Sequence, residues 1–255
     1  MKSIRPAILA FALLGTGAAS ADTRFEADYT VTVRGFTVAR ANFTGEVTGG
    51  RYEVDGKLAT AGLARIFART DATARTAGAL SGDTAQPESF MLSYVQDDKP
   101  SRTEIVFRNG EAVRTAIEPA PKAPPRNIVP IRKADLQSVV DPIAATIVAR
   151  GSPEEICSRT LRLYEGGTRV DVALSLASVG FVYGAGNHAV TCKGSFTPVA
   201  GMKRGDKSYE FMRDKADMQF VYVPASGDGL YLLHSVSART EIGRVEVRAW
   251  RRRVS

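Results

Sequence analysis

The chain alternates apolar and polar positions in short runs that are separated by turn residues. In the stretch FEADYTVTVRG, every second residue from 25 to 33 is apolar or aromatic, which is the period of a half-buried β-strand. The stretches FTVARANFTGEV and RYEVDGKLAT follow, divided by Gly49-Gly50, and Asn109-Gly110 divides SRTEIVFRNGEAVRTAIE. Both dipeptides are typical of hairpin turns. The first half of the chain is therefore predicted to form antiparallel strands.

The second half repeats this pattern. RTLRLYEGGTRVDVALSLA is predicted to be a hairpin around Glu165-Gly166-Gly167, and LYLLHSVSARTEIGRVEVRAW another around Ile242-Gly243. KSYEFMRDKADMQFVYVP is predicted to fold back as strands around Asp214-Lys215. LARIFARTDATAR fits either a helical turn or a long strand, and strand is favoured. These patterns predict about a dozen antiparallel strands.

Two segments interrupt the strand pattern. Residues 118–130 carry five of the 12 prolines and are predicted to be a linker, because proline has no backbone donor for a sheet. Residues 142–150 are predicted to form a short helix, with Asp141 as N-cap and Pro142 at the first position. Ser152 and Glu155 predict a second short turn. We expect a mainly β domain over residues 22–255, its antiparallel strands forming a curved sheet or an incomplete or spiral barrel, with one short helix.

The N-terminus has the pattern of a secretory signal peptide over residues 1–21. Lys2 and Arg5 precede an apolar run, and Ala19-Ser20-Ala21 forms a small-residue cleavage motif, which predicts cleavage between Ala21 and Asp22. The apolar run is shorter than the roughly 20 residues of a spanning helix. We therefore expect an exported, periplasmic protein with no transmembrane segment.

The two cysteines and the basic C-terminus suggest further features. Cys157 and Cys192 are the only cysteines, and an even number in an exported chain predicts a disulfide; two free buried thiols are the alternative. Arg248, Arg251, Arg252 and Arg253 cluster around Trp250 and are a candidate surface for anionic lipid, lipopolysaccharide or another acidic envelope polymer. The alternative is a solvated end of the last strand. Export disfavours nucleic acid as a partner.

The stretch GFVYGAGNHAVTC, residues 180–192, contains a Gly-x-Gly-x-x-Ala step. A dinucleotide-binding loop needs a helix after the glycines, whereas the residues after Gly186 are strand-forming. The stretch is therefore predicted to be a hairpin loop, and no cofactor site is expected.

No catalytic or metal-binding constellation stands out. The chain has only two histidines, His188 and His234, too few for a histidine-rich metal site, and each is expected to be structural. No G-x-S-x-G nucleophile turn is present. The adjacent acids Asp97-Asp98 and Glu154-Glu155 are interpreted as a turn and a helix start. We therefore predict no catalytic, cofactor-binding or metal residues.

Several ordered motifs resemble the bacterial DUF3108 family over roughly residues 25–250. They include the opening strands with Gly50, Arg51 and Tyr52, the segment VVDPIAA at 139–145, LRLYEGGTRVDVAL after Cys157, and the closing ARTEIGRVEVRA. Glu165 stands where related chains tend to have aspartate. The resemblance implies a β-rich envelope protein of the periplasm, and it transfers no catalytic residue.

The expected function is a non-catalytic periplasmic envelope protein that binds a lipid, a glycan or an envelope protein on a curved sheet. The alternatives are a hydrolase of envelope polymers with paired carboxylates and a purely structural scaffold. Six alternating apolar residues are candidates to face a ligand, although core packing is the favoured interpretation of any one of them: Phe90, Leu92, Tyr94, Phe220, Tyr222 and Tyr231.

Overall fold

The computed structural model describes residues 22–62, 64–67, 69–82, 84–121, 127–149, 151–225 and 229–255, and they are mainly strand. The strands are β1 (Thr23–Val33), β2 (Phe36–Thr48), β3 (Arg51–Thr60), β4 (Thr70–Ser81), β5 (Thr84–Gln96), β6 (Lys99–Arg108), β7 (Glu111–Glu118), β8 (Ile147–Ala149), β9 (Thr160–Tyr164), β10 (Arg169–Val182), β11 (Gly186–Ala200), β12 (Met218–Pro224), β13 (Leu230–Thr240) and β14 (Gly243–Val254). The helices are α1 (Ala64–Phe67), α2 (Pro153–Cys157) and α3 (Lys207–Lys215), and the 3₁₀ turns are η1 (Lys133–Leu136) and η2 (Ala144–Thr146).

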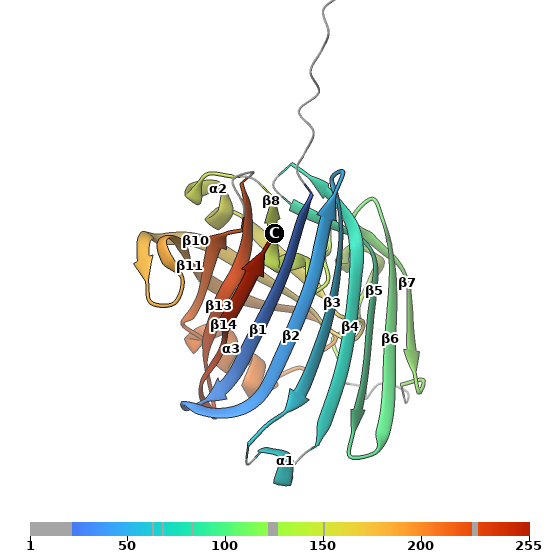
Figure 1. Cartoon of the computed structure of the whole chain (residues 1–255). Coiled ribbons are helices and arrows are strands. Elements are labelled where there is room, and N and C mark those ends of the chain that lie inside the picture. The colour runs from blue at the N-terminus through green and yellow to red at the C-terminus, as the bar shows by residue number, and fades with distance from the viewer. Residues whose placement is uncertain are drawn as a thin grey trace, which may run out of the picture.

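The strands form one sheet that closes on itself. The sheet runs β7-β6-β5-β4-β3-β2-β1-β14-β13-β12-β11-β10-β9, and β8 pairs with both β13 and β5. The ring β5-β4-β3-β2-β1-β14-β13-β8 is therefore a closed antiparallel barrel of eight strands. Figure 1 shows β1 to β6 side by side as one broad, curved wall. The predicted mainly antiparallel β fold is confirmed, but the prediction of a curved sheet or an incomplete barrel is wrong. Strand β8 pairs with both β5 and β13 and so closes the barrel.

The strand β8 was missed because its residues were assigned to a helix over 142–150. Asp141 does act as the expected cap, since its Oδ1 accepts hydrogen bonds from the Ile143 and Ala144 amides, both at 2.9 Å. The helical geometry ends after η2, and Ile147 begins β8. Val148 pairs with Tyr231 of β13 on one side and Thr84 of β5 on the other. Tertiary pairing of β-branched residues overrides the local helix signal here.

Two other local predictions were wrong. Residues 207–215 form α3 and not the first arm of a hairpin; Asp206 caps this helix by accepting from the Ser208 amide at 3.1 Å. In the stretch LARIFARTDATAR, residues 64–67 form α1, so the favoured strand is wrong there, whereas the strand is confirmed from Thr70, where β4 begins. The other turn signals are confirmed. For example, Asn109 and Gly110 join β6 to β7 with positive φ values of 51° and 76°, a conformation that Asn and Gly adopt most easily.

One segment, residues 139–149, most of whose described side chains are buried or half-buried, holds the parts of the sheet together and is called the closing segment below. Val139 donates its amide to Gly110 in the β6–β7 turn at 2.9 Å, and Val140 donates to Arg162 of β9, also at 2.9 Å. The segment thereby links the β6–β7 turn to β9, so that the two end strands of the sheet, β7 and β9, lie near each other. It then continues into the barrel wall as β8.

The apolar side chains of the closing segment belong to the core. Val139 packs among Phe90, Ile105 and Tyr164, whereas Ile147 packs with residues from β1, β3 and β13. Val139, Ile147 and Val148 are at most 2 % exposed. Burying a side chain of this size contributes roughly 1.5 to 3 kcal/mol. The barrel interior around the closing segment is therefore filled by side chains, as in other eight-stranded barrels.

Asp141 anchors the closing segment to the barrel wall. Its carboxylate is fully buried and, besides capping η2, accepts a hydrogen bond from the Thr76 hydroxyl of β4 at 2.7 Å. Burial raises the pKa of Asp141 from 3.8 to about 6, although these hydrogen bonds act in the opposite direction. The barrel thus contains a carboxyl group that gains a proton more readily when the chain is folded.

This raised pKa makes folding stability depend on pH. Between about pH 4 and pH 6 the folded protein holds a proton that the unfolded chain has released, so this contribution is complete below about pH 4 and is lost as the pH rises through 6. The amide introduced by Asp141→Asn cannot titrate. The unfolding free energy of the wild type, minus that of Asp141→Asn, should therefore fall by about 2 kcal/mol from pH 4 to pH 7. Urea unfolding of both proteins across this range measures the difference, and a constant difference would contradict the assignment.

Candidate functional site

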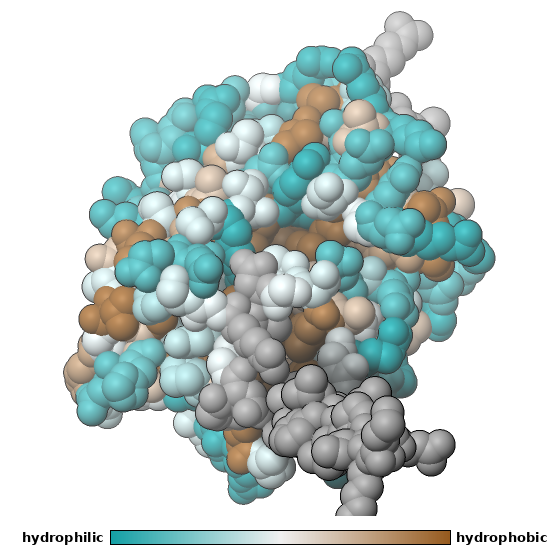
Figure 2. All heavy atoms as spheres, turned by 90° about the horizontal axis from the view of Figure 1, so that it is seen from above, coloured by the Kyte–Doolittle hydropathy of each residue, from teal (hydrophilic) through white to brown (hydrophobic). Residues whose placement is uncertain are grey.

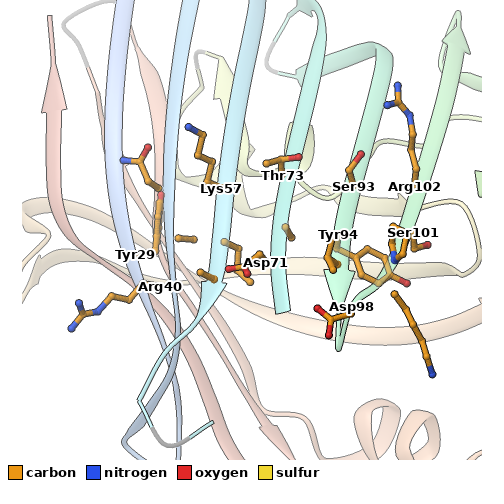
Figure 3. Close-up of a pocket in the computed structure, with 18 of the residues that line it drawn as sticks. Tyr29, Arg40, Lys57, Asp71, Thr73, Ser93, Tyr94, Asp98, Ser101 and Arg102 are labelled. Carbon is orange, nitrogen blue, oxygen red and sulfur yellow. The ribbon is translucent and has the colours of Figure 1, made fainter. Parts of the chain in front are cut away.

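A groove of about 1280 Å³ runs across the barrel wall from β1 to β6 (Figure 3). Each of β2 to β5 contributes three consecutive residues to its lining, and Trp250 of β14 also lines it. A volume above 1000 Å³ accommodates a ligand larger than most small metabolites. This groove is the candidate binding site of the protein.

Cross-strand register arranges the lining in rows. The middle row is mostly apolar, and its members face each other in turn from β1 to β6. Directly opposed residues of neighbouring strands project on the same face of a sheet. The row consists of Tyr29, Ala41, Leu58, Ala72, Tyr94 and Ser101.

The middle row projects into the barrel. The Tyr29 hydroxyl donates a hydrogen bond to the Leu233 carbonyl of β13, two strands away in the ring, at 2.6 Å, and Tyr29 and Ala41 are both less than 10 % exposed. Lys99 stands two residues before Ser101 on β6, so it projects on this same face and also lines the groove. The inner face of the groove therefore combines a continuous apolar strip with a lysine at one end.

The two flanking rows are more polar. One of them crosses seven strands in unbroken register and consists of Asp28, Asn42, Lys57, Thr73, Ser93, Arg102 and Glu118. The other includes Arg40, Ala59 and Asp71. In Figure 3, Lys57, Thr73, Ser93 and Arg102 lie along one side of the labelled group, and Arg40, Asp71 and Asp98 along the other. Because side chains alternate along a strand, these two rows project on the face opposite to the middle row.

Two acids of the lining are engaged by neighbouring groups. Asp28 is 2.5 Å from the Nε of Arg251 and accepts a hydrogen bond from Asn42 at 2.8 Å. The pKa of Asp28 is lowered from its ordinary value, with the Asn42 hydrogen bond as the largest single cause; burial acts in the opposite direction, and Arg251 lowers the pKa further. Asp71 is 3.8 Å from the Nε of Arg69. Lys99, in contrast, has no carboxylate within ion-pair distance among the described residues, so its charge is free to meet an anion.

The six residues predicted to face a ligand lie partly in the groove and partly in the core. Of the six, Tyr94 lines the groove. Phe90, Phe220 and Tyr222 are core residues, which agrees with the alternative interpretation given for them. The sequence pattern did not single out Lys99 or Ala72, because the rows arise only when six strands are placed in register.

The predicted disulfide is present. Cys157 at the end of α2 is bonded to Cys192 of β11, with the two Cα atoms 5.4 Å apart, which is within the usual range. The bond attaches α2 to the strands it covers. The proposed cleavage site lies at the border of the described residues, because Ala21 is outside them and Asp22 is the first residue inside.

The C-terminal arginines do not form a continuous cationic surface, because carboxylates pair with three of the four. On β14, Arg248 donates to Glu246 at 2.7 Å through its Nε. Arg253 lies 3.6 Å from Glu26 of β1. These two arginines are therefore partly neutralised within the chain.

Arg251 and Arg252 are adjacent but have different surroundings. Arg251 pairs with Asp28 and also stacks 5.3 Å from the Trp250 ring. Arg252 is half-buried and donates to the Gly184 carbonyl at 3.2 Å. Because successive side chains of β14 point to opposite faces, the four arginines do not form one surface.

The remaining sequence motifs are structural in the described part of the chain. Gly184 and Gly186 form the β10–β11 turn with positive φ values of 78° and 98°, and strand β11 follows, so the hairpin interpretation is confirmed. Asp97-Asp98 forms the β5–β6 turn. Glu155 forms a capping box with Ser152 at the start of α2, as its spacing predicted.

Two further features are absent from the described ranges. No group of three or more His, Cys, Asp or Glu side chains is arranged to hold a metal ion. None of the helices there has the length and apolar character that crossing a bilayer requires.

A closed antiparallel barrel, extended by further strands on both sides and grooved along one wall, defines the class of protein. The chain belongs to the family described as "Protein of unknown function (DUF3108)", whose profile matches residues 28–249. This match confirms the resemblance noted in the sequence. No curated protein matches the chain.

One solved structure is similar in fold. It is described as "Crystal Structure of Beta-barrel-like Protein of Domain of Unknown Function DUF1849 from Brucella abortus". The TM-score is 0.50 and the sequence identity 10 %, and the alignment covers 91 % of this chain and 98 % of that one. At this identity the similarity concerns the fold alone.

The pairing of the C-terminal arginines predicts weak binding to anionic membranes. Replacing Glu26 and Glu246 by Gln should expose the charges of Arg253 and Arg248, each of which contributes up to about 1 kcal/mol near an anionic surface. The double variant should therefore bind phosphatidylglycerol vesicles more strongly than the wild type in co-sedimentation at low salt. The gain should shrink at about 0.15 M salt because of screening. Equal binding of the two proteins would show that the carboxylates do not mask these arginines.

Proposed function

We propose that this protein is an exported, non-catalytic protein of the bacterial envelope that holds a lipid in the groove across β1 to β6. The observation that carries the proposal is the apolar row from Tyr29 to Ser101, with Lys99 on the same face. An acyl chain would lie along this row, since such a strip removes apolar surface from water.

The position of Lys99 favours a ligand with an anionic headgroup. It lies at the β6 end of the apolar row, and the described residues supply no carboxylate to pair with it. A phosphate or carboxylate headgroup would form charge-assisted hydrogen bonds with its ammonium group. The proposed ligand is therefore an anionic lipid, in preference to the glycan or protein partner that the sequence also allowed.

Export is supported by two independent features. The N-terminal 21 residues have the pattern of a signal peptide, and the Cys157–Cys192 disulfide is typical of oxidising compartments such as the periplasm. Two of the four acids in the groove lining, Asp28 and Asp71, are engaged by arginines. These two acids offer no specific support for the alternative of a carboxylate-based hydrolase.

Native mass spectrometry of protein purified from the envelope fraction of cells that export it tests the proposal. The wild type should carry an adduct with the mass of an anionic lipid. Ala72→Trp should lose it, because Ala72 lies in the middle of the apolar row and an indole would fill the groove there. Ala173→Trp, at an exposed position of β10 away from the groove, should keep it.

A matched pair of lysine variants in the same experiment tests the headgroup contact. Lys99→Met should lower the fraction of protein that carries the adduct, whereas Lys193→Met, at an exposed position of β11 outside the groove lining, should leave it unchanged. Circular dichroism and a thermal melt establish that each variant is folded. A wild type without any adduct, or an Ala72→Trp variant that retains it, would contradict lipid binding in this groove.

A further inference from the structure

A second cavity lies where the β10–β11 turn approaches the end of β14. Its volume is about 370 Å³, which suits a small ligand. Residues of the β10–β11 turn and of strands β11, β12, β13 and β14 line it. Figure 2 views the end of the barrel toward which β14 runs, where hydrophobic residues surface within a largely hydrophilic rim.

The cavity has an apolar side and a polar side. Val223, Leu232 and Val254 come from three different strands, β12, β13 and β14, and supply apolar surface. Asn187, His188 and Arg252 supply the polar groups. An occupant that satisfies both sides must itself have a polar and an apolar part.

Arg252 is the charged group of this cavity. Unlike its three neighbours on β14, it pairs with no carboxylate in the described part of the chain, and its contact there is the Gly184 carbonyl at 3.2 Å. Burial lowers the pKa of Arg252 from its ordinary value, and the Tyr29 hydroxyl only partly offsets this. A half-buried guanidinium without a counter-charge is energetically costly.

A second polar side chain near Arg252, His234, is neutral and does not balance its charge. His234 is fully buried beneath the turn, within 3.7 Å of where a Cβ on Gly184 would lie. Burial first, then Arg252 and Arg248, lower the pKa of His234 to about 4, with Glu246 opposing. His234 is therefore neutral at pH 7. Its two ring nitrogens, one donor and one acceptor in the neutral ring, have no hydrogen-bond partner among the described groups. The charge of Arg252 is therefore not balanced by His234.

We infer that this cavity binds the anionic group of a small amphiphile, with Arg252 pairing with the anion and the walls of β12, β13 and β14 receiving a short apolar tail. The ligand class is a carboxylate or phosphate monoester that carries a short hydrocarbon chain. A bound anion would neutralise the guanidinium, and Asn187 and His188 lie on the same lining to donate to it. The site is separate from the groove, whose lining shares no residue with it.

Isothermal titration of the full protein at pH 7 with sodium octanoate tests this inference. Octanol serves as the probe without charge, and inorganic phosphate as the probe without tail. Octanoate should bind more tightly than either. Arg252→Met should weaken octanoate binding by at least about tenfold, the loss expected for one charge-assisted pair. Arg253→Met, the matched change at the adjacent exposed arginine, should leave it unchanged.

Chemical-shift mapping on the wild type keeps the test independent of how the variants fold. Octanoate should shift the amide signals of Asn187, His188 and Val254. Ala72→Trp should still bind octanoate, which separates this site from the proposed lipid groove. The inference is overturned by any of three results: no octanoate binding, equal binding of octanol, or shifts confined to β1 to β6.

Discussion

The architecture depends on the closing segment, residues 139–149, whose backbone pairs with strands from distant parts of the chain. Val139 and Val140 connect the β6–β7 turn to β9, and β8 then inserts between β5 and β13. Without β8 those two strands would both have open edges at this point, which are templates for aggregation. Asp141 fixes the segment because it caps η2 and accepts from Thr76 of β4.

Closure of the barrel also sets the geometry of the candidate sites. The groove requires β1 to β6 to remain in register over a curved wall, since its apolar row takes one residue from each strand. The smaller cavity requires the β10–β11 turn to lie against β12, β13 and β14. Both sites pair a cation with apolar surface, so the two proposals describe one protein suited to anionic amphiphiles of different size.

Sequence patterns predicted the strands well because alternation and turn dipeptides such as Asn109-Gly110 are local signals. They failed where tertiary pairing decided the outcome. Ile147 and Val148 followed a true helix cap yet formed a strand, because two edges were available on either side of them. The cysteines were paired correctly, but the arginine cluster was divided by the alternation of β14: Arg251 and Arg252 are adjacent in sequence and have different partners. Neither site was recognisable before the strands were placed in register.

Native-state hydrogen exchange at β8 tests the closed barrel most directly. A strand paired on both sides opens only when the ring opens, so the protected amides of Ile147 to Ala149 should exchange with a free energy close to that of global unfolding. They should match the protected amides of β1 and β14. Exchange of the β8 amides at free energies far below the global value, while β1 and β14 remain protected, would show that the ring is open in solution.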